Sequence, residues 1–337
     1  MNDVLLKVDD VRKEFPTHSK EVVQAVAGVS LEVHKGETLG LVGETGCGKS
    51  TLARCMAHLY DVTSGSVWFE GQEISKLSRK AMRPLRRDVQ VIFQDPYGSL
   101  NPRRRVGSII GDPFAIHGIA AGNERKKKVQ ELMELVGLNP EHYNRFPAEF
   151  SGGQRQRIGV ARALALRPKL VICDEPVSAL DVSIQAQIIN LLSDLQREFD
   201  LTYVFISHDL SVVRHVSDRI AVMYLGKIVE LAPTRELFGQ TRHPYTRALL
   251  SALPVADPDT ADSREQIILG GDIPAATNPP TGCRFHTRCP KARLDCTAEE
   301  PVLEPVLDDN PAHRTACIYP LTVGEDLSTA VPDLKAS

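Results

Sequence analysis

A glycine-rich segment, GETGCGKS at 43–50, constrains this chain more than any other feature. It matches the pattern G-x-x-x-x-G-K-[ST], in which the backbone amides of a curled loop surround phosphate oxygens. The apolar run TLGLV at 38–42 precedes it, and the helix-like TLARCMAHL follows it. A strand, a glycine-rich turn and a helix in this order predict a phosphate-binding loop in an α/β core.

The residue types within this phosphate loop (43–50) suit phosphate binding. Gly43, Gly46 and Gly48 let the backbone curl so that successive N–H groups point inward. Lys49 offers a positive charge to the β- and γ-phosphates, the hydroxyl of Ser50 can ligate Mg²⁺, and the following helix directs its positive end toward the same anion. A chance glycine-rich turn is the weaker interpretation, because the flanking strand and helix both fit.

A second candidate for the nucleotide site is LVICDE at 170–175. An apolar strand that ends in Asp174 brings this carboxylate beside the phosphate loop, where it can hold Mg²⁺ through a water. If the strand ends there, Glu175 can face the γ-phosphate and polarise an attacking water. A solvated Asp–Glu pair at a strand end is the alternative, and the phosphate loop makes it the minority interpretation. Both features together predict a nucleotide hydrolase without naming it.

Composition excludes several other classes of protein. The 337 residues suggest about two domains, and 42% apolar residues can bury a core, which excludes wholesale disorder. A formal net charge of −3 gives no sign of a dedicated nucleic-acid binder. No apolar run approaches the roughly 18 residues of a membrane span, and the acidic start, with Asp3, Asp9 and Asp10, does not resemble a secretion signal. We therefore expect a cytosolic protein that reaches a membrane only through a partner.

Hydrophobic periodicity outlines the rest of the chain. Alternating patterns predict half-buried strands at 5–11, 29–33 and 66–71, and apolar runs predict fully buried strands at 38–42 and 170–173. From Ile184 onward one helical face carries apolar residues, and a strand-like run at 202–207 follows; that face comprises Ile188, Leu191, Leu192, Leu195 and Phe199. This order implies parallel pairing. Residues 97–165 are predicted to form an inserted helical subdomain that becomes helical from about Glu124, and the proline-rich stretch 254–282 a linker or extended arm.

The run SGGQRQRIGVARAL at 151–164 resembles the signature motif of the ABC-type ATPases. Taken alone, it predicts an N-cap at Ser151, glycine amides and a long helix, which is an anion-binding helix N-terminus without its own lysine. The resemblance implies that two cassettes face each other head to tail. The signature segment, Ser151, Gly152, Gly153 and Gln154, would then contact ATP bound to the other cassette.

Other motifs of that family occur in the family's order. Gln94 in VIFQDP, Ser178–Asp181 (SALD) and His208 in FISHD match positions that the family uses around the γ-phosphate and the dimer interface. The resemblance implies catalysis by Glu175 with His208 and Gln94, and Mg²⁺ held by Ser50, Gln94 and Asp174. It also implies that Phe15 stacks on adenine. ATP would contact Phe15, Gly43, Glu44, Thr45, Gly46, Cys47, Gly48, Lys49, Ser50, Thr51, Gln94, Asp174 and His208.

Three further segments resemble the ATPase subunits of bacterial oligopeptide and dipeptide importers, so that the likeness covers nearly the whole chain. They are IFQDPYGSLNPR at 92–103, HPYTRALLSALP at 243–254 and GCRFHTRCPKA at 282–292. The DPY and SGGQRQR forms favour the subunit conventionally lettered F. The resemblance implies a peripheral protein on the cytoplasmic face of the plasma (inner) membrane. Its implied partners are a second, non-identical ABC ATPase subunit, two transmembrane permease subunits and an external peptide-binding protein, with no nucleic acid.

Four cysteines crowd the end of the chain, at Cys283, Cys289, Cys296 and Cys317. In a chain without a secretion signal they suggest a metal staple rather than disulfides, but no C-x-x-C pair is present. The spacing alone leaves Zn²⁺ and an iron–sulfur cluster open, with His286 or His313 as an alternative to one cysteine ligand, and with four unligated thiols as a further possibility. The family resemblance favours a [4Fe–4S] cluster.

The fold class that we predict is therefore α/β. It is a P-loop NTPase core of the ABC ATPase type with an antiparallel β subdomain, an inserted α-helical subdomain and a small Cys-rich extension. We place the nucleotide-binding domain at 1–253 and the C-terminal importer extension at 254–337. The expected function is ATP hydrolysis that energises import of di- or oligopeptides. Alternatives are the same role in a nickel, glutathione or oligosaccharide importer, or a soluble non-transport ABC ATPase.

Overall fold

The computed structural model describes residues 3–17, 21–95, 98–253, 266–306, 310–327 and 332. The chain forms two compact units, each built from separate stretches of sequence. The first unit comprises Met1–Leu6, Glu32–Thr38 and Phe69–Ser207, and the second comprises Lys7–Leu31, Leu39–Trp68 and His208–Ser337. Residues close to the phosphate loop in sequence therefore share a unit with the C-terminal third of the chain.

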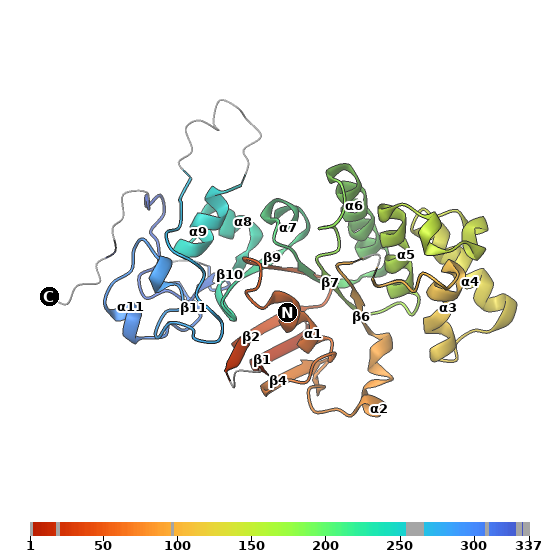
Figure 1. Cartoon of the computed structure of the whole chain (residues 1–337), viewed down its shortest axis with the longest axis horizontal. Coiled ribbons are helices and arrows are strands. Elements are labelled where there is room, and N and C mark those ends of the chain that lie inside the picture. The colour runs from red at the N-terminus through yellow and green to blue at the C-terminus, as the bar shows by residue number, and fades with distance from the viewer. Residues whose placement is uncertain are drawn as a thin grey trace. The chain divides into compact units, whose positions relative to one another are not determined.

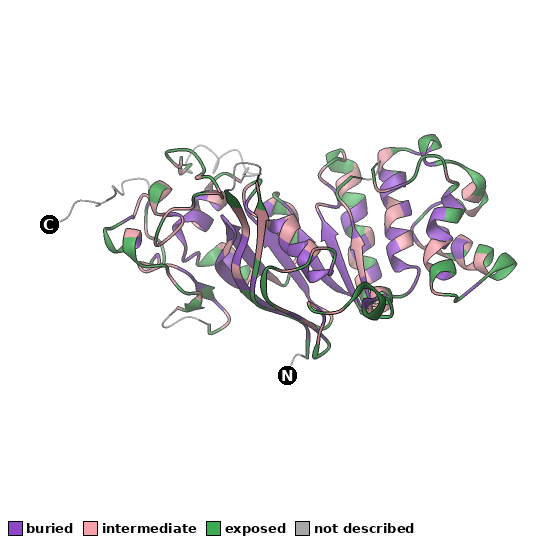
Figure 2. Cartoon of the chain, turned by 60° about the horizontal axis from the view of Figure 1, so that its bottom comes forward, coloured by how far each residue is buried: buried purple, intermediate pink, exposed green. Residues whose placement is uncertain are grey.

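The first unit contains a parallel sheet in the order β8-β7-β6. Its strands are β6 (Val89–Ile92), β7 (Leu170–Asp174) and β8 (Thr202–Ile206), and α6 (Val182–Phe199) connects β7 to β8. Every residue of β7 and β8 is buried, as the purple strands of Figure 2 show, because parallel strands are covered on both faces. The predicted strand, helix and parallel strand are confirmed.

Helices dominate the middle of the first unit. They are α3 (Val106–Ile116), α4 (Gly122–Leu135) and α5 (Gly152–Leu164), with two short 3₁₀ turns at Pro140–Asn144 and Pro147–Glu149. The three helices pack against one another, as can be followed in Figure 1. They lie within residues 97–165, but α3 precedes Glu124, so helix begins earlier in the structure than the sequence predicts.

The second unit carries a mixed sheet in the order β11-β12-β10-β9-β3. Its strands are β3 (Thr38–Val42), β9 (Arg219–Tyr224), β10 (Lys227–Pro233), β11 (Glu304–Pro305) and β12 (Arg314–Thr315). β3 pairs parallel with β9, whereas the other pairs are antiparallel. The C-terminal segment thus extends the same sheet that carries β3.

A second sheet places β2, β1 and β4 side by side in that order. These strands are β1 (Val4–Pro16), β2 (Val22–His34) and β4 (Ser64–Phe69). Parts of β1 and β2 alternate between buried and exposed residues, which is typical of a sheet with one covered face. The three half-buried strands predicted from alternation are confirmed.

Short elements complete the described chain. They are α1 (Lys49–Met56), β5 (Gln72–Glu73), α2 (Arg79–Met82), a 3₁₀ turn at Leu85–Arg87, α7 (Leu210–Val216), α8 (Thr234–Gly239), α9 (Pro244–Ser251), a 3₁₀ turn at His286–Arg288 and α11 (Asp295–Ala298). Residues 266–282 contain neither helix nor strand, as expected for an extended arm, whereas 254–265 lie outside the described residues. Within the described ranges, no helix has both the length and the apolar character that spanning a bilayer requires.

Glu230 of β10 joins the C-terminal segment to the mixed sheet of the second unit. Its side chain is fully buried and accepts hydrogen bonds from the amides of Arg242 (2.7 Å) and His243 (3.1 Å). Nε2 of the equally buried His313 lies 2.8 Å from the same carboxylate. One buried carboxylate therefore satisfies polar groups from two other parts of the chain, residues 242–243 and His313.

Replacing Glu230 by alanine leaves those buried donors without an acceptor. We expect Glu230→Ala to lower the free energy of unfolding by about 3–5 kcal/mol, the range for removing one partner of a buried pair. Chemical denaturation followed by circular dichroism measures it. Glu236→Ala is the matched control, because Glu236 accepts from Asn310 at the surface and its loss costs about 1 kcal/mol or less. Equal losses in both variants would contradict the central role of Glu230.

Candidate nucleotide-binding site

All three glycines of the phosphate loop have positive φ, and at two of them neighbouring backbone leaves no room for a side chain. Gly43 (φ 152°) and Gly48 (φ 108°) lie in the left-handed half of conformational space. A Cβ at Gly43 would lie 2.1 Å from the carbonyl oxygen of Met223, and one at Gly48 would lie 2.0 Å from that of Ala25. The loop therefore curls in close contact with neighbouring backbone, as the sequence predicts.

Lys49 directs its charge back into this loop. It is the first residue of α1, is 4% exposed, and donates from Nζ to the carbonyl oxygens of Gly43 (2.7 Å) and Glu44 (3.0 Å). Burial raises the pKa of the Cys47 thiol beside it, so that this thiol stays protonated at neutral pH. A cation at the N-terminus of a helix within a loop of backbone amides suits a phosphate ligand.

The first unit supplies acidic residues at the end of β7. Asp174 is the last residue of the strand and is 3% exposed. Glu175 follows with φ 48°, and its amide donates to the carbonyl of Ile206 (3.0 Å). The left-handed conformation of Glu175 ends the strand, as predicted. Its side chain therefore does not have to point away from that of Asp174, as the next residue of a continuing strand would. Gln94 Nε2 donates to Glu175 Oε2 (2.9 Å), so the structure brings together two of the three predicted catalytic residues.

The signature segment (151–154) forms a capped helix start. Ser151 Oγ accepts from the amide of Gln154 (3.3 Å), and Gln154 Oε1 accepts from the amide of Ser151 (3.0 Å), which is a capping box. Ser151 and Gln154 are exposed, whereas Gly153 is buried so tightly that a Cβ would lie 2.5 Å from Cγ2 of Ile184. The predicted N-cap is confirmed.

The remaining predicted residues are distributed between the two units. The phosphate loop, Phe15 and His208 belong to the second unit, whereas Gln94, Asp174, Glu175 and the signature segment belong to the first. Phe15 packs edge-on against Tyr60 with centroids 5.7 Å apart, and Lys13 Nζ lies 5.0 Å from its ring centre. His208 is exposed. Adenine stacking by Phe15 and γ-phosphate contact by His208 stay predictions, as does the joining of these groups around one ATP.

Two family models match the chain. Residues 26–178 match the ABC transporter model, and residues 229–296 match the model for the C-terminal region of oligopeptide/dipeptide transporters. The oligopeptide transport ATP-binding protein AppF of Bacillus subtilis is 54% identical over 322 residues, covering 94% of this chain and 97% of that protein. The chain belongs to the ATP-binding proteins of the oligopeptide/dipeptide ABC transporters.

Other relatives of this ABC transport ATPase agree with the fold and the class. The oligopeptide transport ATP-binding protein OppF of Escherichia coli is 50% identical, covering 89% of this chain and 93% of that protein. The ATP-binding cassette MJ0796, solved as a dimer bound to ADP and Pi, matches with a TM-score of 0.63 and 29% identity, covering 68% of this chain and 99% of that one. The predicted P-loop ABC ATPase fold is confirmed, and the chain is an ATPase coupled to transport.

The four C-terminal cysteines line one small cavity of about 20 Å³, which is roughly the space of one water molecule. Burial raises the pKa of Cys289 and of Cys317 to about 12, and it also raises that of Cys283. Among the described residues, no group of three or more His, Cys, Asp or Glu side chains could hold a metal ion. The structure gathers the four thiols, but it does not support the predicted iron–sulfur or zinc site.

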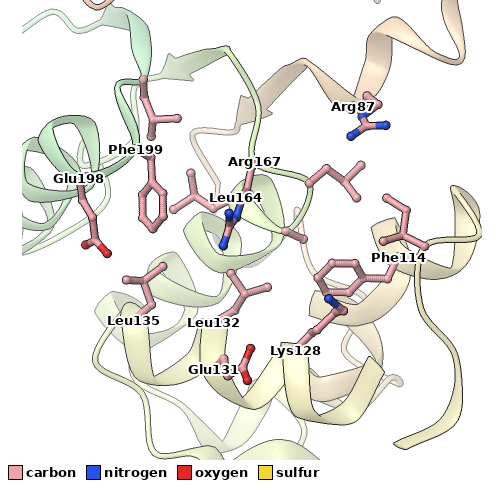
Figure 3. A pocket seen from close by; sticks show the side chains of 14 residues that line it. Arg87, Phe114, Lys128, Glu131, Leu132, Leu135, Leu164, Arg167, Glu198 and Phe199 are labelled. Atoms are coloured by element: carbon pink, nitrogen blue, oxygen red, sulfur yellow. The ribbon is translucent and has the colours of Figure 1, made fainter. Parts of the chain in front are cut away.

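A larger cavity of about 570 Å³ lies in the first unit, away from every predicted site residue. Figure 3 shows Phe114 of α3, and Leu132 and Leu135 of α4, among the side chains that line it. Leu164 and Phe199 line it from α5 and α6, and charged residues surround it. Cavity size alone therefore does not locate the nucleotide site of this fold.

Two residues near the phosphate loop carry no role in the sequence prediction. Tyr245 and Arg288 both contact Glu44, although they lie 201 and 244 residues away in the chain. The only sequence signal was that each belongs to a segment typical of the importer family, HPYTR and GCRFHTRCPKA. No spacing rule connects those segments to the loop.

Proposed function

We propose that this transport ATPase hydrolyses ATP to energise import of dipeptides or oligopeptides. The observation that carries the proposal is the presence, in one chain, of a phosphate loop and a C-terminal segment that matches oligopeptide/dipeptide transporters. The nucleotide-binding domain comprises 1–253, with the helical subdomain at about 97–165, and the importer extension comprises 254–337. A nickel, glutathione or oligosaccharide cargo is the alternative within transport.

ATP binds along the phosphate loop, with Lys49 on its phosphates. The oxygen donors of Ser50, Gln94 and Asp174 suit Mg²⁺, which supplies charge neutralisation at the phosphates when bound. Glu175 takes a proton from the attacking water, and His208 contacts the γ-phosphate. The hydrogen bond from Gln94 to Glu175 supports this assignment, because it orients the carboxylate of the general base.

The signature segment completes the site of another cassette. A helix N-terminus with a capping serine and glycine amides, but with no lysine of its own, suits an anion that another chain supplies. We therefore propose that the chain pairs with a second, non-identical ATPase subunit of the same family. The pair lies peripherally on the cytoplasmic face of the plasma membrane and drives two permease subunits, which an external peptide-binding protein loads.

The segment at 95–115 is the proposed docking surface for a permease subunit. It follows Gln94 directly in sequence, so that movement of the glutamine can reach the permease. Pro96 and Tyr97 lie outside the described residues. Within the remainder, Arg104 forms two hydrogen bonds with Asp112 (2.5 and 2.7 Å), which fixes the start of α3.

Glu175→Gln tests the general base. We expect turnover of the assembled transporter to fall about 10²–10⁴-fold while ATP stays bound, since the amide cannot accept the proton.

Lys49→Ala should instead weaken nucleotide binding itself. ATPase assays and MgATP titration separate the two effects. Near-normal turnover in Glu175→Gln would contradict its role, and unchanged affinity in Lys49→Ala would contradict that of the phosphate loop.

Affinity purification from detergent-solubilised membranes tests the proposed assembly. We expect the full-length chain to retain two multispanning membrane proteins and a second ABC ATPase. Altering Ser151 and Gly153 in every cassette should abolish ATP hydrolysis without removing those partners, because the cap and the close glycine approach are lost. Recovery of ribosomes instead of membrane proteins would favour a non-transport ABC ATPase.

A metal at Cys283, Cys289, Cys296 and Cys317 stays a prediction. The reason to test for it is that the four thiols line one cavity. Iron, zinc and acid-labile sulfide are measured on protein purified without oxygen; about four irons with sulfide indicate a [4Fe–4S] cluster, and zinc alone indicates the alternative. Cys289→Ser should lower the metal content, whereas Cys55→Ser, a buried thiol elsewhere, should not. Protein without either metal would contradict both assignments.

A further inference from the structure

Two segments of the C-terminal region converge on one residue of the phosphate loop. The first segment, HPYTR at 243–247, starts α9, and the second, RFHTRC at 284–289, contains the 3₁₀ turn at His286–Arg288. Both contact Glu44, the second residue of the loop. All of these residues lie within the second unit.

Tyr245 holds the backbone of Glu44. The amide of Glu44 donates to Tyr245 Oη at 2.9 Å, and the tyrosine itself is fully buried. His243 caps α9 by accepting the amide of Tyr245 on Nδ1 (3.1 Å). Burial lowers the pKa of His243 to about 3, so the ring stays neutral and able to accept. The hydrogen bond to His243 thus fixes the backbone of Tyr245, which carries the hydroxyl that contacts Glu44.

Arg288 holds the side chain of Glu44. Its two terminal nitrogens donate to the two carboxylate oxygens at 2.8 and 3.1 Å, which is the bidentate geometry that an arginine fork allows. The arginine side chain is only 8% exposed, and its guanidinium lies 5.9 Å from the ring centre of Tyr224. Hydrogen bonding to Glu44 raises the pKa of Arg288, so the guanidinium stays charged.

A packed aromatic cluster makes these contacts rigid. Tyr224, Tyr245 and Phe285 pack with ring centroids 4.7–5.3 Å apart, and each is 1% exposed or less. Just beyond Tyr224, the amide of Gly226 donates to the carbonyl of Cys47 (2.8 Å). The loop is therefore held at the Glu44 amide, the Glu44 carboxylate and the Cys47 carbonyl.

We propose that Tyr245 and Arg288 are positioning residues, through which the C-terminal region presets the phosphate loop for ATP. The proposal rests on ATP binding at this loop, as proposed above. A glycine-rich loop that had to be ordered by its ligand would lose affinity, because ordering costs about 1–2 kcal/mol per residue. Arg288 also compensates the negative charge of Glu44, which would otherwise oppose an anionic ligand.

A double-mutant cycle tests this coupling in the assembled transporter. The variants are Arg288→Gln, Glu44→Gln and the combination of both. We expect Arg288→Gln to raise the KM for ATP about tenfold, the effect of losing a charge-assisted bond that preorganises a loop. The kcat should stay within about threefold, because neither residue is placed on the reacting atoms. The double variant should be no worse than Arg288→Gln, since both changes remove the same interaction.

Lys291→Gln is the matched control for the C-terminal region. Lys291 forms an ion pair with Glu325 (2.6 Å) that is about as buried as the pair between Arg288 and Glu44. Among the described residues, it donates a hydrogen bond to the carbonyl of Pro320 and none to the phosphate loop. We expect the KM for ATP of the Lys291→Gln variant to equal that of the unmodified protein. Thermal unfolding of each variant shows that the fold is intact, and Arg288→Lys, which keeps the charge but not the fork, should recover only part of the affinity.

The outcomes separate this inference from the proposed site. If Lys49→Ala weakens MgATP binding and Arg288→Gln does not, the loop binds ATP and the positioning role is wrong. A KM increase that the Lys291→Gln control shares would equally overturn it, because the effect would then come from general loosening of the C-terminal region. If Lys49→Ala leaves affinity unchanged, the proposed nucleotide site itself fails.

Discussion

Close approach between backbones governs the phosphate loop. The carbonyl oxygens of Met223 and Ala25 lie where any side chain at Gly43 or Gly48 would have to sit. These contacts come from β9 and β2, two strands far apart in sequence. The shape of the loop is therefore set by packing against two sheets rather than by local preference alone. Because Lys49 directly follows Gly48, this packing also determines where Lys49 and the start of α1 lie.

In the first unit, the predicted functional residues Glu175 and Ser151 lie where a strand ends and where a helix begins. β7 ends because Glu175 adopts a left-handed conformation, which moves its carboxylate toward Gln94. α5 begins at a reciprocal cap between Ser151 and Gln154, which leaves glycine amides at the helix end. In both cases a backbone irregularity, rather than a flexible side chain, directs the polar group.

Sequence alone predicts the features that rest on local pattern. The glycines of the loop, the buried strands and the cap at Ser151 follow from residue type and periodicity, and the structure contains all of them. Tyr245 and Arg288 could not be found in this way, because their partner lies more than 200 residues away. The cysteines show the same limit: their crowding predicts proximity, but spacing cannot tell whether four thiols converge on a metal ion.

The C-terminal segment is part of the structure that surrounds the phosphate loop, since residues 39–68 and 208–337 belong to one compact unit. Buried Glu230 anchors the backbone of Arg242 and His243, and His243 in turn fixes Tyr245. Arg288 directly precedes Cys289, one of the four thiols around the small cavity. The arginine that holds Glu44 and one of the thiols around the small cavity are therefore supplied by adjacent residues. Because the bidentate pair with Glu44 depends on where the backbone places Arg288, the C-terminal segment contributes directly to the position of the phosphate loop.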